Sequence, residues 1–347
     1  MELAIARYRL LFKHPFGTAH GLRDGTDSVF VRLNEGEIVG YGEATLPPYL
    51  KETQMSVVHE ISIAEVKQFI NSLDHSVLMS FPSDLPLSGP SRSALSTAYY
   101  DLISKHLGIR INELLEVGSE RSEAKTMVTM GHSKSDEVAS KLIELPASDL
   151  LKVKLGSELD RSTLEALSTL DDRPFFLDAN QGWTRVEQAL ELISLVGADR
   201  VRGIEQPFAK ERWDLHRELK RRTDVPVFSD ESIQDLDDLE SAGEAFSGVN
   251  LKLMKCGGLD NALKMANRAK ELGLEVMLGS MSESSLGCGA MAALSGCADL
   301  LDLDGPWLIK NDPFEGMSMN NGSLQIAGGS GIGVDPREGL ELDWVKL

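Results

Sequence analysis

Short runs of β-forming residues recur at a nearly constant interval through the last two thirds of the chain. The ends of successive runs lie 23 to 28 residues apart, and a stretch with helical spacing and charged punctuation follows each run. This interval fits one strand, one loop, one amphipathic helix and one return. The eight runs end at Gly131, Gly156, Asn180, Phe208, Ser232, Lys255, Met281 and Pro306. The pattern predicts an α/β fold, a TIM-like barrel of seven or eight (β/α) units, over residues 121–312.

A doubly wound open sheet is the competing arrangement for alternating strands and helices. Such sheets often open with a glycine-rich turn that binds phosphate and leads into a helix. The nearest match is Gly329, Gly331 and Gly333, which Asp335 and Pro336 follow in place of a helix. Eight nearly equal units without a phosphate turn favour the closed barrel.

The segments on either side of the repeats have a different character. Residues 1–10 and 28–45 are β-rich around an Asn-Glu-Gly turn, which predicts a meander. Three helical stretches follow, over residues 54–73, 90–107 and 111–115. We therefore expect a separate α+β domain over residues 1–120, with the irregular tail, residues 313–347, folding back onto it.

The charge balance limits the kinds of partner that the protein can bind. Acidic residues outnumber basic ones by 54 to 35, so no net positive field exists to attract a phosphate backbone; this disfavours nucleic acid and favours small ligands or metal cations. Three cysteines without a Cys-x-x-Cys pair fit a reducing cytoplasm. The absence of an 18-residue apolar run and of a signal-peptide core predicts no membrane association and a cytoplasmic location. A homo-oligomer is compatible with the sequence, which leaves the oligomeric state open.

Carboxylates end three successive predicted strands, at Asp178, Glu205 and Asp230. The carboxyl ends of barrel strands meet at the active-site face, so these acids should converge. Close carboxylates repel one another unless a cation lies between them, and an all-oxygen set suits a hard ion. The set predicts one Mg²⁺ site, although each acid taken alone would be explained by a helix cap or a surface ion pair.

Lysines on the flanking strands complete the pattern. Lys152 and Lys154 lie two residues apart on the second strand, so both point inward if either does, and Lys252 lies on the sixth strand. Amines on opposite sides of a metal-held substrate fit removal of a proton from one face of a carbon and its return to the other. We expect burial and neighbouring ammonium groups to lower the lysine pKa values toward neutrality. Lys255 is expected in the loop after its strand.

These motifs together resemble a known family. In order, KVKLG, DANQGW, IEQPF, SDES, NLKLMKCGG and GSMSES are similar to the enolase superfamily, in its muconate lactonizing enzyme subgroup, over essentially the whole chain. The resemblance implies Asp178, Glu205 and Asp230 as Mg²⁺ ligands, Lys154 and Lys252 as bases, and an assisting electrostatic role for Lys152. It also implies an α+β capping domain over the barrel mouth, and abstraction of the proton α to a carboxylate through an enediolate. The missing histidine on strand seven disfavours the mandelate racemase-like branch.

The eighth predicted strand narrows the substrate. Asp302 and Asp304 lie on one side of this strand without an evident metal role, and two free carboxylates would attract a cationic group such as an α-ammonium. The pair resembles the element by which dipeptide epimerases of the subgroup hold the amino terminus of a dipeptide. A strand end capped by water, or by a lysine such as Lys310, is the alternative.

Further substrate contacts are expected from the loops. The segment from Thr18 to Gly25 lies where the family's specificity loop falls, and its Arg23 either pairs with an acidic substrate side chain, as in Ala-Glu epimerases, or points to solvent. His20 is expected on the lid surface. Ser280, Met281 and Ser282, by the same resemblance, should supply backbone groups and wall surface.

The sequence therefore predicts an isomerase, a Mg²⁺-dependent dipeptide epimerase that inverts the α-carbon of the C-terminal residue by two-base proton transfer. The alternatives are o-succinylbenzoate synthase or N-acylamino acid racemase chemistry on the same scaffold, and a non-catalytic barrel that binds a metal and a carboxylate. The free ammonium implied by Asp302 and Asp304 argues against the first two, and the filled catalytic positions argue against the third.

Overall fold

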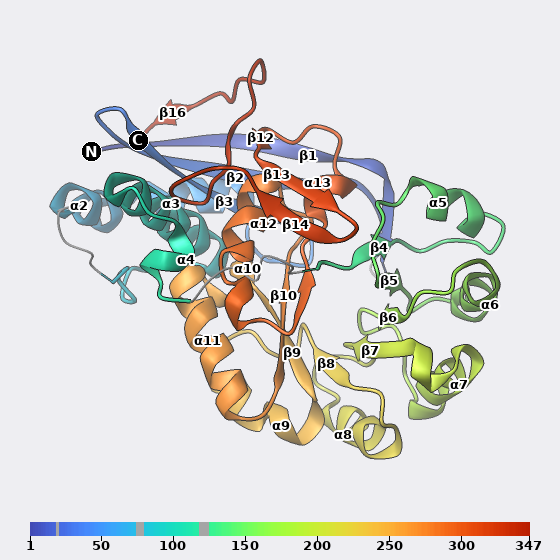
Figure 1. Cartoon of the computed structure of the whole chain (residues 1–347). Coiled ribbons are helices and arrows are strands. Elements are labelled where there is room, and N and C mark those ends of the chain that lie inside the picture. The colour runs from blue at the N-terminus through green and yellow to red at the C-terminus, as the bar shows by residue number, and fades with distance from the viewer. Residues whose placement is uncertain (19–20, 74–79, 118–124) are drawn as a thin grey trace.

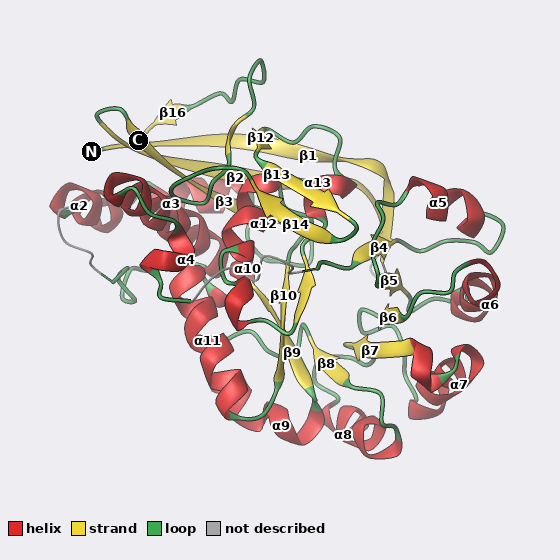
Figure 2. Ribbon diagram, viewed as in Figure 1, coloured by secondary structure: helices red, strands yellow, loops and turns green. Residues whose placement is uncertain are grey.

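The computed structural model describes residues 1–18, 21–73, 80–117 and 125–347. Its largest sheet has eight strands in the spatial order β11-β10-β9-β8-β7-β6-β5-β4, and each neighbouring pair is parallel. The strands are β4 (Val128–Met130), β5 (Leu151–Lys154), β6 (Phe175–Asp178), β7 (Val201–Glu205), β8 (Val227–Ser229), β9 (Gly248–Lys252), β10 (Glu275–Gly279) and β11 (Leu300–Asp302). A parallel bridge between Thr126 and Leu301 joins the two ends of the sheet. The predicted barrel is confirmed (Figures 1 and 2).

Helices lie between successive strands on the outside of the barrel (Figure 2). Their coverage explains why the strands are buried along nearly their whole length. The last unit is short, because only one helical turn, α13, follows β11. The helices are α5 (Val138–Glu144), α6 (Asp160–Leu170), α7 (Val186–Val196), α8 (Trp213–Arg222), α9 (Ala242–Ala245), α10 (Leu253–Cys256), α11 (Leu259–Glu271), α12 (Ser285–Ala292) and α13 (Gly305–Leu308).

Aromatic and methionine side chains fill the barrel interior below its mouth. Met127, Phe176, Phe228 and Met277 form a separate buried cluster, in which the Phe176 and Phe228 ring centroids lie 5.2 Å apart. Phe176 and Phe228 each precede a mouth carboxylate by two residues and therefore point to the same side of their strands. Gly203 leaves room for both rings, because a Cβ there would lie 2.6 Å from Phe176. The layer gives the site a rigid apolar floor.

The N-terminal segment forms an antiparallel sheet in the order β16-β1-β2-β3, covered by helices. Its elements are β1 (Glu2–Thr18), β2 (Gly21–Glu35), β3 (Ile38–Leu46), α1 (Gln54–Ile61), α2 (Ala64–Ser72), α3 (Gly89–Leu107), α4 (Ile111–Leu114) and β16 (Val345–Lys346). The helix expected over residues 54–73 is two helices. The Ser62 hydroxyl donates to the Val58 carbonyl at 2.6 Å, and the chain turns extended at Ile63, which ends α1.

The C-terminal tail adds the short pairs β12 (Phe314–Glu315) with β15 (Asp335–Pro336) and β13 (Met317–Asn320) with β14 (Ser323–Ile326). The tail also joins the N-terminal sheet, since β16 pairs with β1.

Helix α3 joins the N-terminal sheet to the barrel. It packs closely on β3 because Gly42 has no side chain: a Cβ there would lie 1.9 Å from the Ala94 carbonyl oxygen. On its barrel side, Arg92 makes a buried two-point pair with Asp260 of α11, at 2.9 and 3.0 Å. The sheet and the barrel are therefore held in one orientation by a buried charge pair as well as by apolar contact.

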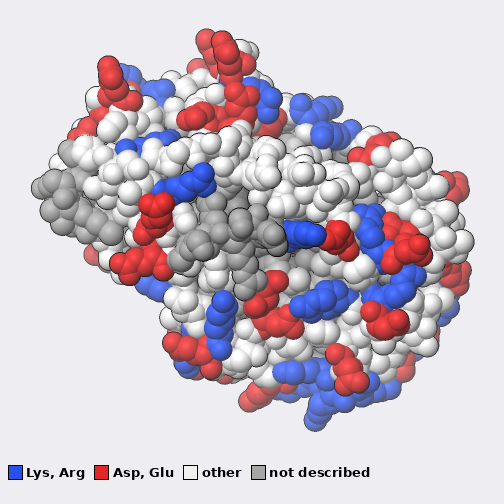
Figure 3. Space-filling view, viewed as in Figure 1, with Lys and Arg blue, Asp and Glu red and all other residues white. Residues whose placement is uncertain are grey.

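On the face shown in Figure 3, acidic and basic side chains are interspersed over the surface. Among the helices that the structure describes, every one is too short or too polar to cross a lipid bilayer.

Candidate active site

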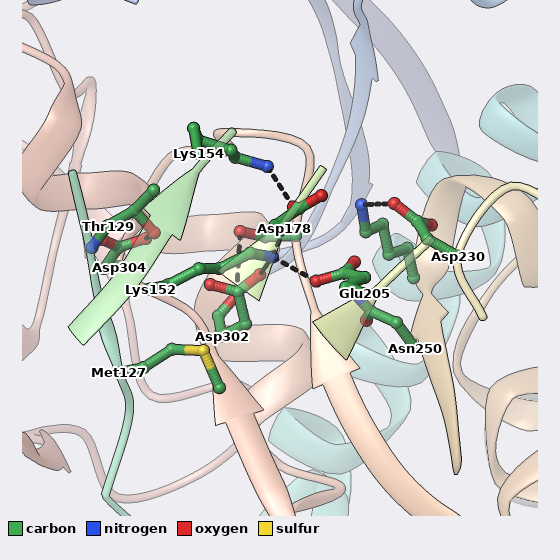
Figure 4. A network of polar contacts seen from close by, with 12 residues as sticks. Met127, Thr129, Lys152, Lys154, Asp178, Glu205, Asp230, Asn250, Asp302 and Asp304 are labelled. Carbon is green, nitrogen blue, oxygen red and sulfur yellow. Dashed lines mark hydrogen bonds and ion pairs between the residues drawn. The ribbon is translucent and has the colours of Figure 1, made fainter. Parts of the chain in front are cut away.

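Three buried carboxylates converge at the barrel mouth (Figure 4). Asp178 ends β6, Glu205 ends β7, and Asp230 follows β8 directly. Asp178 and Glu205 are paired in the register of the two strands and are fully buried, and Asp230 is 4% exposed. The structure thus brings together the three acids that end successive strands.

The amine of Lys152 lies among Asp178, Glu205 and Asp302 (Figure 4). Its Nζ is 2.6 Å from Glu205 Oε2, 3.1 Å from Asp178 Oδ2 and 2.6 Å from Asp302 Oδ2. The side chain reaches this point because β5 turns alternate residues inward. Lys152 therefore connects the three-acid group to the last barrel strand.

Two further amines lie on either side of the acids. Lys154 Nζ is 2.5 Å from Asp178 Oδ2, and Lys252 Nζ is 2.6 Å from Asp230 Oδ2. In Figure 4, Asp178 and Glu205 separate Lys154 from Asp230. A small molecule held against the carboxylates would have one amine on each side.

Lys255 belongs to the site, contrary to its predicted place in a loop. The one-turn helix α10 begins directly after β9 and ends at Gly257 and Gly258, both with positive φ, so the chain turns back toward the mouth. Lys255 Nζ donates to Asp230 Oδ1 at 2.7 Å and to the Asp230 carbonyl at 2.6 Å. Lys255 and Lys252 thus bind different oxygens of the Asp230 carboxylate.

The expectation of lowered lysine pKa values is wrong for Lys152 and Lys252. Burial alone would lower both, but facing carboxylates outweigh it and hold the pKa of each well above its ordinary value: Asp302, Glu205 and Asp178 for Lys152, and chiefly Asp230 for Lys252. The pKa values of the acids shift in opposite directions. Burial and the charge of Asp178 raise the pKa of Glu205 to about 7, whereas Lys154 and Lys152, against burial, lower that of Asp178 to about 2.

The donor set fits a hard cation. Within the described residues, no three acidic, histidine or cysteine side chains form a ready-made metal site, because the lysine amines lie between the carboxylates. All the acidic donors are oxygens, and one buried oxygen, Asn180 Oδ1, has no hydrogen-bond partner. Glu205 Oε2 has the Lys152 ion pair but no hydrogen bond of good geometry. A divalent cation with oxygen preference would satisfy these groups once the amines move aside.

Asp302 and Asp304 are both at the mouth, but they are not free carboxylates as predicted. Lys152 pairs with Asp302, and Asp304 Oδ2 accepts the Thr129 backbone N–H at 2.6 Å. Lys310, the alternative partner, is exposed, and its charge acts on Asp24 of β2. Burial and the charge of Asp302 raise the pKa of Asp304 to about 7.

A small cavity of about 50 Å³ lies over these groups. It brings together nearly all the predicted substrate contacts with residues of the N-terminal sheet. Its lining consists of Arg23, Tyr49, Thr129, Lys154, Asn180, Lys252, Ser280, Met281, Ser282, Asp302, Asp304 and Leu308. Ser282 has a φ of 66°, so the loop after β10 makes a sharp turn at the cavity wall.

The predicted specificity segment is the tip of the β1–β2 hairpin. Arg23, in β2, reaches the cavity, where its Nη1 is buried without a hydrogen-bond partner and its guanidinium lies 5.6 Å from the Phe12 ring centroid. Burial lowers the pKa of Arg23 below its usual value. The side chain of Thr18, and His20 as a whole, lie outside the described residues.

Sequence reasoning missed Tyr49, Thr129 and Leu308 as lining residues. Thr129 lies at the end of β4, and its position at a strand end is the sequence signal that could have identified it. Tyr49 follows two prolines in a loop, and its hydroxyl contacts Met281 Sδ at 2.7 Å; no motif marks it.

A second pair of buried acids lies where the N-terminal sheet meets the barrel. Glu43 of β3 accepts hydrogen bonds from Thr45 Oγ1 at 2.7 Å, from the Ser284 side chain at 2.5 Å and from the Gly287 N–H at 3.0 Å. Glu283, fully buried beside it, accepts only the Met281 N–H, and its Oε2 has no partner. Burial and the charge of Glu43 raise the pKa of Glu283 to about 8.

Comparison with known proteins agrees with this architecture. The family model described as Enolase C-terminal domain-like matches residues 137–340. The L-Ala-D/L-Glu epimerase of Bacteroides thetaiotaomicron is 35% identical over 336 residues, which cover 96% of this chain and 88% of that protein. The L-Ala-D/L-amino acid epimerase of a Maribacter species is 34% identical and is covered to 99%, with 96% of this chain matched.

Solved structures show the same fold over the whole length. The dipeptide epimerase from Methylococcus capsulatus, in complex with Mg and the dipeptide L-Arg-D-Lys, superimposes with a TM-score of 0.82 at 27% identity, covering 96% of this chain and 99% of that one. The matched barrel, its position in the chain and the two relatives above 30% identity together show that this chain belongs to the Enolase C-terminal domain-like family.

Proposed function

We propose that this protein is a Mg²⁺-dependent dipeptide epimerase that inverts the α-carbon of the C-terminal residue. The observation that carries the proposal is the pair of amines, Lys154 and Lys252, on either side of a buried carboxylate group. Relatives that match this chain over nearly its full length are named dipeptide epimerases, which supports the same reaction class.

Asp178, Glu205 and Asp230 would hold the magnesium ion, with Lys255 fixing Asp230. The ion would supply positive charge beside the substrate carboxylate and so acidify the adjacent α-carbon. It would also offset the negative field that raises the pKa of Lys252.

The chain's own residues carry out the proton transfer. One amine, in its neutral form, takes the proton from the α-carbon on its side, while the opposite amine, as ammonium, delivers a proton to the other face. Lys154 and Lys252 exchange these roles with the starting configuration. Lys152 supplies a fixed positive charge between the acids and Asp302.

Recognition of the substrate would come from two sides of the cavity. Asp302 and Asp304 bind the dipeptide ammonium, with Asp302 shared with Lys152. Arg23 pairs with an acidic side chain on the C-terminal residue, as in Ala-Glu, because its buried Nη1 lacks a partner. Ser280, Met281 and Ser282 form the wall, and Thr18 lies at the hairpin tip.

We further assign residues 1–120 with 313–347 to a capping unit and residues 121–312 to the catalytic barrel. The pairing of β16 with β1 supports this division. The acidic composition supports a small-molecule substrate in place of nucleic acid, and three free, buried cysteines support a reducing, cytoplasmic environment.

The test is proton NMR of a dipeptide mixture in D₂O with the protein and Mg²⁺. We expect loss of the α-proton signal of the C-terminal residue together with the appearance of the diastereomer, fastest for L-Ala-L-Glu. Exchange in N-acylated amino acids alone would replace the dipeptide assignment with the racemase alternative. Absence of Mg²⁺-dependent exchange in every compound would refute catalysis.

A further inference from the structure

A second cavity adjoins the active-site cavity. It has a volume of about 170 Å³ and lies between the β1 strand, the end of β4, the end of α5 and α13. Thr129, Asp304 and Leu308 line both cavities. The two spaces therefore meet at the carboxylate that is assigned to the substrate ammonium.

A dipeptide needs more room than the first cavity offers. Its volume of about 50 Å³ holds about four water molecules, at roughly 10–15 Å³ each. The second cavity is larger than the roughly 150 Å³ that admits a benzene ring into an engineered protein cavity.

Covalent geometry places one substrate group at this boundary. The N-terminal α-carbon is bonded directly to the ammonium nitrogen, so its side chain begins one atom away from the group that Asp304 holds. Lys154, Lys252 and Asp302 line the first cavity and not the second, whereas Asp304 lines both.

The lining determines the chemical class of the side chain. Met130, Leu145, Pro146 and Trp307 present apolar surface. Two lysines line this cavity: Lys141 donates to the His132 carbonyl and to Ser133 Oγ, each at 3.0 Å, and Lys13 is an exposed residue of β1. The outer rim is spanned by the contact of His14 with Glu144 at 2.6 Å, between β1 and α5. The charges of Lys141, His14 and Glu144 are partnered within the protein, and Lys13 is exposed to water, so the interior favours an apolar group.

We propose that this second cavity binds the side chain of the N-terminal substrate residue and admits large apolar side chains such as those of Leu, Met and Phe. The inference rests on the proposed dipeptide epimerase activity. It extends the substrate class from Ala-Glu to dipeptides with a bulky apolar first residue.

The experiment compares kcat/KM for L-Ala-L-Glu, L-Leu-L-Glu and L-Phe-L-Glu in the wild type, Leu145→Trp, Leu145→Ala and the control Ile143→Trp. Leu145→Trp fills the cavity, and we expect it to lower kcat/KM for the Leu and Phe substrates by at least about tenfold while changing the Ala substrate by less than about threefold. Leu145→Ala should favour the Phe substrate. Ile143 lies in the last turn of α5, two residues before Leu145, and is 85% exposed, so its substitution should change none of the three values.

Two results would overturn the cavity assignment. One is a wild type that epimerises L-Ala-L-Glu but processes L-Leu-L-Glu at least about 100-fold less efficiently. The other is equal loss on all three substrates in Leu145→Trp combined with no change in preference in Leu145→Ala. Failure of the proposed function gives a different result, since the wild type would then epimerise none of the dipeptides.

Discussion

The two buried acidic clusters of this protein balance their charge in different ways. At the barrel mouth, Asp178, Glu205 and Asp230 face the amines of Lys152, Lys154, Lys252 and Lys255. At the junction of sheet and barrel, Glu43 and Glu283 have only hydroxyl and backbone N–H partners.

The difference separates a site that exchanges cations from one that joins two parts of the chain. Ammonium groups on flexible side chains are able to move aside for a metal ion, so the mouth can keep Asp178 and Asp230 ionised with either partner. Neutral donors cannot neutralise two carboxylates, and the pKa of Glu283, raised to about 8, indicates that Glu283 keeps its proton at neutral pH. The arrangement at the mouth is thus suited to catalysis, and the arrangement at the junction holds the sheet against the barrel.

The strongest test of the mouth removes its amines. Lys154→Ala and Lys252→Ala should each lower the epimerisation rate by about 10³-fold, within the usual range for loss of a general acid or base. Each variant should still exchange the α-proton of one substrate configuration with solvent, because the other amine remains. The readout is epimerisation and deuterium incorporation by NMR. Lys264→Ala, on the exposed face of α11, is the control; full activity in both lysine variants would contradict two-base catalysis.

The protonation of Glu283 at the junction of sheet and barrel is tested by the pH dependence of the free energy of unfolding. The folded-state pKa of Glu283 exceeds its ordinary value of 4.5, so the folded protein binds more protons than the unfolded chain between pH 4.5 and about 8. The Glu283 contribution to stability is therefore lost as the pH rises through this window, by on the order of 5 kcal/mol at roughly 1.4 kcal/mol per pKa unit. Urea unfolding at several pH values should show a flatter pH profile for Glu283→Gln than for the wild type. Parallel profiles would show that Glu283 is ionised in the folded protein.

A measurement of Mg²⁺ affinity distinguishes the acidic cluster at the mouth from the one at the junction. Asp178→Asn should weaken Mg²⁺ binding at least about 100-fold, since loss of even an outer partner of a metal ligand costs up to that much. Isothermal titration calorimetry measures the change, and Glu283→Gln, a substitution in the other cluster, should leave it unaltered. A similar loss in both variants would mean that the two clusters are not independent.

The smallest effect is expected where the mouth meets the substrate ammonium. Asp304→Asn should raise the KM for L-Ala-L-Glu by about tenfold, the lower range for a hydrogen bond to a charged group, and should change kcat less. Steady-state kinetics on the purified variant gives both constants. A KM equal to that of the wild type would place the dipeptide amino terminus elsewhere.

The sequence predicts the features that follow from strand periodicity. Asp178 and Glu205 lie at the ends of adjacent parallel strands, and the carboxyl ends of such strands always meet at one edge. Lys152 points inward because β5 alternates. The nearly constant interval between the β-forming runs is therefore enough to predict both the barrel and the position of the acids.

Other features depend on distances that the sequence does not contain. Lys255 returns to Asp230 because α10 makes one turn before two glycines, and its direction depends on the helix geometry. The number of charges is known from the sequence, but the sign of the Lys252 pKa shift depends on how close Asp230 lies. Glu43 and Glu283 meet across about 240 residues, and although Glu283 lies in the GSMSES run, no local pattern indicates that the two acids are in contact.

The pairing of β16 with β1 has a consequence for biogenesis. Residues Ala4 and Ile5 lie beside Lys346 and Val345, so the outer edge of β1 gains this partner only after the barrel between them has been synthesised. Until then, that edge is available to pair with another chain, which is the usual route to strand aggregation. Arg7 and Arg9 place positive charge along β1 during this interval. Slow translation of the tail should therefore promote aggregation through the N-terminal sheet more than through the barrel.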